Sequence, residues 1–164
     1  MEKIKTIEIL ITIIVVYIAF QNHRIAKSKM RLDLYKQRFK IYNELQEFFK
    51  YIMIEGTVTS SVAGNLAHNT KEAVFLYDSF IVKYLKNMHS KAFELIALDR
   101  KLRDTSLPVG ETRSKYACEM EALLNWFIKE HQKSANVFAE YLQIDKKIVD
   151  RVKDYIFPKD DKIK

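Results

Sequence analysis

The sequence predicts an all-α protein in which an N-terminal transmembrane helix continues into an antiparallel bundle of three to four long helices. Only three Gly and two Pro occur among 164 residues, which leaves few positions for tight turns. Apolar residues recur at the three- and four-residue steps of helices over most of the chain. The first apolar run, residues 6–22, holds Glu8 as its only charged residue and is followed directly by a basic stretch. These observations divide the chain into an anchor (residues 1–23), a helical bundle (residues 24–157) and a charged tail (residues 158–164).

The run at residues 6–22 is expected to cross a membrane as one helix. It offers about 17 residues to the bilayer, at the short end of the usual range for a spanning helix. No cleavage site of small residues follows it, which favours an uncleaved anchor over a signal peptide. Because Glu8 lies in the first turns, a hydrated carboxylate at the membrane surface is favoured over a role inside a pore. The residues predicted to form the anchor are Ile9, Leu10, Ile13, Ile14, Val16, Tyr17 and Phe20.

Basic residues are concentrated directly after the anchor. Residues 21–40 carry a net charge of +6, whereas residues 41–164 hold 19 basic and 18 acidic residues, so no nucleic-acid partner is predicted. Since positive residues stay on the cytoplasmic side, the N-terminus is expected outside and the bundle in the cytoplasm. The lone cysteine, Cys118, excludes a disulfide framework and suits a reducing compartment. The residues expected to contact lipid headgroups are Arg24, Lys27, Lys29 and Arg31.

The first helix of the bundle is predicted to be continuous with the anchor, from Ile4 to Glu55. No Gly or Pro interrupts it before Gly56. Its predicted apolar stripe consists of Leu32, Tyr35, Phe39, Tyr42, Phe49 and Met53, with Gln46 as the one interruption. A second row, made of Leu45, Phe48 and Ile52, widens this face and favours burial in a bundle over a two-stranded coiled coil.

A second long helix is predicted after a polar connector, residues 55–70, which itself allows a short helix through Val58, Val62 and Leu66. Asn69 and Glu72 form a capping-box pattern that predicts the start of this helix, and it ends near Arg103. Its stripe consists of Tyr77, Ile81, Tyr84, Met88, Leu95 and Leu102. The first four of these residues are expected to pack against Tyr35, Phe39, Tyr42 and Phe49 of the first helix.

A third helix is predicted from about Glu111. It carries Met120, Leu123, Leu124, Phe127 and Ile128, and it continues or restarts through Val137, Phe138, Tyr141 and Leu142. An amphipathic segment, "KKIVDRVKDYIF" at residues 146–157, precedes the charged tail.

Several stretches, in their order along the chain, resemble a widespread group of small bacterial proteins. These proteins have a helical cytoplasmic region, often behind an N-terminal anchor. The stretches are "LDLYKQRFKIYNEL", "AVFLYDSFIVKYL", "LPVG", "LLNWF" and "NVFAEYL", and the resemblance covers roughly residues 31–142. It rests on aromatic and apolar positions, and it implies a shared fold in the bacterial inner membrane. It implies no activity and no functional residue, because no activity is known for the group.

The sequence contains no motif for catalysis, a metal or a cofactor. Its four histidines, His23, His68, His89 and His131, lack the spacing of helical metal sites. No Gly-rich phosphate loop occurs, and Ser60 and Ser61 lack a nucleophile-elbow pattern. The protein is therefore predicted not to be an enzyme and to use no cofactor.

Three functions remain open from the sequence. The favoured one is a membrane-anchored interaction or scaffold module that binds a protein partner or a second copy of itself. Trp126 is the candidate residue for this contact, because aromatic side chains dominate partner surfaces. The alternatives are an effector that assembles and breaches the membrane when a partner releases it, and a helical enzyme without a recognisable motif.

Overall fold

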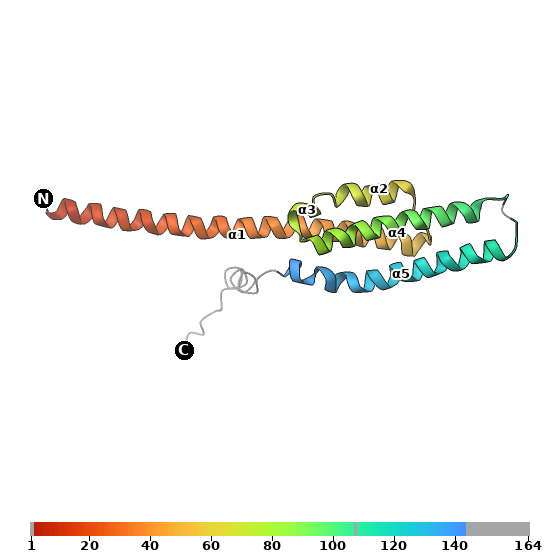
Figure 1. Cartoon of the computed structure of the whole chain (residues 1–164). Coiled ribbons are helices and arrows are strands. Elements are labelled where there is room, and N and C mark those ends of the chain that lie inside the picture. The colour runs from red at the N-terminus through yellow and green to blue at the C-terminus, as the bar shows by residue number, and fades with distance from the viewer. Residues whose placement is uncertain (1, 107, 144–164) are drawn as a thin grey trace, which may run out of the picture. The chain divides into compact units, whose positions relative to one another are not determined.

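The computed structural model describes residues 2–106 and 108–143, with side chains from Leu10 onward. Figure 1 shows helices joined by short connections, with no β-strand among these residues, so the predicted all-α class is confirmed. The helices are α1 (Glu2–Glu55), α2 (Ser60–Asn69), α3 (Ala73–Leu76), α4 (Ser79–Arg103) and α5 (Glu111–Leu142). The chain divides into two units, one made of residues 1–36 and 144–164 and the other of residues 37–143.

In the second unit, the part of α1 after residue 36 and the helices α2, α3, α4 and α5 pack around one apolar core. α1 and α5 are antiparallel, because Tyr42 contacts Phe138, whereas Phe49 contacts the earlier Phe127, with ring centroids 5.3 and 6.5 Å apart. The core residues with the largest fully buried side chains are Ile41, Leu45, Phe49, Ile52, Ile81, Met88, Leu95, Phe127 and Phe138. The predicted antiparallel bundle is present in this unit.

The apolar stripe predicted for the first helix is correct only in part, because Phe49 is buried and Tyr42 packs against the core, but other residues of the stripe are exposed. Phe39 is 41% exposed and Met53 is also exposed, whereas the buried residues of α1 are Ile41, Leu45, Phe48, Phe49 and Ile52. The prediction followed the 3.5-residue repeat of a coiled coil, which drifts by about 20° per heptad from the face of a straight helix. Leu45, Phe48 and Ile52, which were predicted to widen the stripe, therefore lie at the centre of the buried face of α1.

The predicted start of the second long helix was also wrong. Asn69 ends α2 and donates from its amide to Glu44 of α1 at 2.7 Å, and Glu72 makes no side-chain cap. α4 begins at Ser79, because Asp78 Oδ1 accepts hydrogen bonds from the backbone N–H groups of Phe80 and Ile81 at 3.0 and 3.1 Å. The Asp78 carboxylate, which accepts hydrogen bonds from two N–H groups at the helix start, therefore sets where α4 begins.

The other predicted helix boundaries within the described residues agree with the structure. α1 ends at Glu55, where Gly56 adopts a φ of 63° that other residues rarely tolerate. The connector contains α2, which buries Ala63 and Leu66, and α5 is one helix without a restart. The predicted segment at residues 146–157 and the tail at residues 158–164 lie outside the described residues.

Candidate functional site

The most unusual surface of the described chain is an uncovered apolar segment of α1 between Leu10 and Phe20. Nine large apolar side chains in it are between 51% and 63% exposed. They are Leu10, Ile11, Ile13, Ile14, Val15, Val16, Tyr17, Ile18 and Phe20. Since successive residues of a helix point about 100° apart, this set surrounds the helix and does not form a single stripe. A helix that is apolar on all sides belongs in a protein core or a membrane.

Two contacts mark the polar end of this segment. The Gln21 amide donates a hydrogen bond from Nε2 to the Tyr17 hydroxyl oxygen at 2.9 Å. The guanidinium group of Arg24 lies over the Phe20 ring, 5.8 Å from its centroid. The predicted headgroup residues Arg24, Lys27, Lys29 and Arg31 are all exposed. The structure thus places the predicted anchor residues from Leu10 onward next to a basic, water-accessible surface.

Within the described residues, no helix combines the length and the apolar character that crossing a membrane requires. The side chain of the predicted anchor residue Ile9 lies outside those residues.

Trp126, the predicted interaction residue, is half-buried. Its ring packs against the neighbouring Phe127 with centroids 5.0 Å apart, and its remaining surface faces a shallow groove between α4 and α5. The groove is lined by Lys91, Glu94, Leu98, Glu119, Ala122, Leu123 and Trp126. Trp126 therefore contributes to the packing of the bundle and remains partly exposed beside α4.

A second exposed apolar patch lies on α3 and the first turn of α4. Phe75 is 86% exposed, and Val74 and Phe80 are exposed as well.

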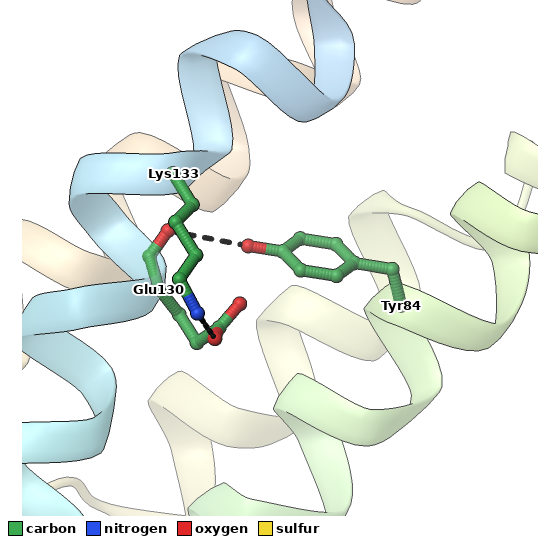
Figure 2. Close-up of polar contacts among 3 residues, drawn as sticks. All are labelled: Tyr84, Glu130 and Lys133. Carbon is green, nitrogen blue, oxygen red and sulfur yellow. Dashed lines mark hydrogen bonds and ion pairs between the residues drawn. The ribbon is translucent and has the colours of Figure 1, made fainter.

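Figure 2 shows how α4 and α5 are joined by polar groups. The Tyr84 hydroxyl donates to the backbone carbonyl oxygen of Glu130 at 3.3 Å, while the Glu130 carboxylate pairs with Lys133 at 3.0 Å. Burial, with a smaller effect from Glu130, raises the pKa of the Tyr84 hydroxyl and keeps it a neutral donor. These contacts fix the two helices against each other.

A cluster around Arg38, which sequence reasoning missed, joins α1 to three other helix ends. Arg38 donates from Nε to the Leu76 carbonyl oxygen at 2.8 Å and from Nη1 to the Tyr141 carbonyl oxygen at 3.4 Å. Both acceptors end helices, where carbonyl groups lack helical partners and attract cations. The sequence gives no clear signal for this cluster, because the two acceptors lie 38 and 103 residues from Arg38 along the chain.

Tyr141 and Asp78 extend this cluster to the start of α4. The Tyr141 hydroxyl donates to Asp78 Oδ2 at 2.6 Å. This bond raises the pKa of Tyr141 to about 12 and lowers the pKa of the Asp78 carboxyl group. The N–H groups of Ile81 and Phe80 lower the pKa of Asp78 further. The arrangement holds these helix ends together, since its polar groups form hydrogen bonds with a helix end or a neighbouring side chain.

The histidines of the bundle pack against aromatic rings. His131 lies 5.5 Å from Phe49 and His89 lies 4.8 Å from Phe93, measured between ring centroids. Among the described residues, no group of three His, Cys, Asp or Glu side chains is arranged to hold a metal ion.

No family model matches the chain, and no curated protein or solved structure shows significant similarity to it.

Proposed function

We propose that this protein is a single-pass, membrane-anchored interaction module whose helical bundle lies at the cytoplasmic face of the inner membrane. The observation that carries this proposal is the exposure of the apolar residues around the whole circumference of α1 between Leu10 and Phe20. The segment proposed to cross the membrane, residues 6–22, also includes four residues before Leu10.

Lipid covers such a segment better than a single partner helix does. Moving one Val, Ile, Leu or Phe side chain out of water contributes about 1.5–3 kcal/mol. A partner helix would cover one stripe and leave the opposite side in water, whereas lipid chains cover all sides. The four exposed basic residues after the segment add roughly 1 kcal/mol each near an anionic membrane surface. They also orient the chain with the bundle in the cytoplasm.

The bundle is the interaction part of the proposed function. The groove at Trp126 combines an indole with a charged rim, and an aromatic anchor inside a polar rim is common in partner-binding surfaces. An anchor confines the bundle to the membrane plane and raises its effective concentration toward a partner in the same membrane. We propose binding and not catalysis as its activity.

Alkaline extraction of membranes from bacterial cells that express the full chain tests the anchor. We expect the wild-type chain to stay in the membrane pellet, because extraction removes only peripheral proteins. A variant with Ile13→Lys and Val16→Lys is expected in the supernatant, since each charge opposes insertion by about 2.5–3.5 kcal/mol.

A matched control carries Ile54→Lys and Phe75→Lys, which change two exposed apolar residues of the second unit. This control should remain in the pellet. Release of the wild-type chain together with both variants would refute the proposed anchor.

A further inference from the structure

We propose that Tyr17, Phe20, Gln21 and Arg24 form the boundary layer at which α1 leaves the bilayer, with the Arg24 guanidinium group bound to the phosphate of a lipid headgroup. This inference rests on the proposed membrane anchor and specifies its depth and its headgroup partner.

Two contacts of the same kind lead to this assignment. In each, a polar group reaches back by one helical turn to an aromatic ring, from Gln21 to Tyr17 and from Arg24 to Phe20. Long side chains of a helix point toward its N-terminus, so the amide and the guanidinium group lie close to the levels of the two rings. The first positive charge after the apolar segment is thus held at the level of its last aromatic residue.

Aromatic and basic residues at this position match the chemistry of a membrane interface. Tyrosine prefers the headgroup level because its ring is apolar and its hydroxyl group is polar. The N–H donors of a guanidinium group lie in its own plane, so contact of its face with a ring leaves them directed outward, where they match the oxygens of a phosphate. Arginine is suited to this contact because its aliphatic stem tolerates apolar surroundings.

Acidic residues are scarce around Arg24 along α1. Asp33 is the only acidic residue between positions 21 and 40, and it lies nine residues away, more than two helical turns. Among the described residues, no ion pair joins Arg24 to an acidic side chain. A phosphodiester of the membrane surface supplies the missing negative charge at the required level.

The length of the apolar segment agrees with this boundary. The segment proposed to cross the membrane, residues 6–22, rises about 24 Å, at roughly 1.5 Å per residue. The hydrocarbon core of a bilayer is about 30 Å thick, so this length is at the short end for a spanning helix. With Phe20 at the boundary, Lys27 lies about 10 Å out in the headgroup and water region.

Spin labels on the full chain in phosphatidylglycerol vesicles test this depth. Cys118, which is exposed, is replaced by serine, and single labels are placed at Ile13, Ile18 and Lys27. A label in lipid collides mainly with molecular oxygen, whereas a label in water collides mainly with a water-soluble nickel complex. We expect lipid at Ile13 and Ile18 and water at Lys27.

The outcomes separate the two proposals. Water at all three positions would refute the membrane anchor itself. Lipid at Ile13 combined with water at Ile18, or with lipid at Lys27, would leave the anchor intact and overturn the boundary at Phe20.

Arg24→Gln tests the phosphate contact, with Lys86→Gln as a matched change on an exposed residue of the bundle. Without its phosphate contact the helix is expected to shift, so the collision ratio at Ile18 should change in Arg24→Gln and not in Lys86→Gln. An unchanged ratio in Arg24→Gln would overturn the role of Arg24.

Discussion

Tyr77 donates a hydrogen bond from its hydroxyl group to the backbone carbonyl oxygen of Arg38 at 2.8 Å, and Arg38 donates to the carbonyl oxygen of Leu76, the residue before Tyr77. The two residues therefore bind each other's backbone segments. This reciprocal contact holds α1 against the turn that precedes α4. Burial raises the pKa of Tyr77, with Arg38 opposing, so its hydroxyl group remains a donor at neutral pH.

Tyr77→Phe should lower the free energy of unfolding by about 0.5–1.5 kcal/mol, the usual net contribution of a hydrogen bond. The ring keeps its packing against Phe138, whose centroid lies 5.4 Å away, so only the bond is lost. Chemical denaturation of the full chain in detergent measures the difference. Tyr51→Phe is the control, because the half-buried Tyr51 makes no hydrogen bond through its hydroxyl group within the described chain. Equal losses in both variants would contradict a specific role for the Tyr77 bond.

Phe49→Ala should destabilise the bundle by about 3–5 kcal/mol, the usual cost of deleting a buried phenyl ring. Phe49 is 0% exposed and contacts Phe127 and His131. Phe39→Ala is the matched change on the same helix, and its cost should be much smaller because Phe39 is 41% exposed. Thermal unfolding at several protein concentrations compares the variants. A loss in Phe39→Ala that equals the loss in Phe49→Ala would contradict the buried face of α1.

The bundle should lose stability in acid, because protonation of Asp78 removes the contribution of its carboxylate. Its folded-state pKa is lowered, first by the hydrogen bond from Tyr141, so its contribution to stability is present above the unfolded pKa of about 3.9. That contribution is lost as the pH falls through the lower folded value. Asp78→Asn keeps a helix-capping side chain but does not titrate, so its stability should change less between pH 5 and pH 2. Parallel acid profiles for the two proteins would contradict this account of Asp78.

Glu119→Arg should weaken the capture of a protein partner if the groove at Trp126 is the contact surface. Glu119 is exposed and lines this groove, so reversing its charge alters the surface without disturbing the core. Cross-linking in intact cells followed by purification from detergent measures the captured partner. Glu47→Arg, an exposed change on α1, should leave capture unchanged. If wild-type protein is recovered without any partner or second copy, the groove has no such role.

The local pattern of the sequence was sufficient for the long helices. The scarcity of Gly and Pro was enough to predict α1 and α5 as long helices, and Gly56 was enough to predict the end of α1. Backbone conformation at these places depends on neighbouring residues. The face of α1 that becomes buried depends on where α4 and α5 lie, and this is a property of the whole bundle. A heptad pattern could not distinguish Phe39 from Ile41, since both are apolar and two residues apart.

Some residues of the candidate sites were predicted from the sequence, and others were missed. Apolar and basic runs near the N-terminus are visible as composition, and Leu10, Tyr17 and Arg24 were assigned from it. Arg38 was missed because its partners, Leu76 and Tyr141, are 38 and 103 residues away in the sequence. The start of α4 was missed because Asn69 and Asp78 are both good capping residues, and tertiary contacts decide which one is used.

Flotation of the purified full chain with phospholipid vesicles at about 1 M salt tests membrane insertion most directly. At this ionic strength the Debye length is about 3 Å, so attraction between the basic residues and the vesicle surface is largely screened. We expect the wild-type chain to float with the vesicles and the variant with Ile13→Lys and Val16→Lys to remain at the bottom of the gradient. Flotation of the wild-type chain only at low salt, or no flotation at all, would contradict insertion of the apolar segment of α1 into the bilayer.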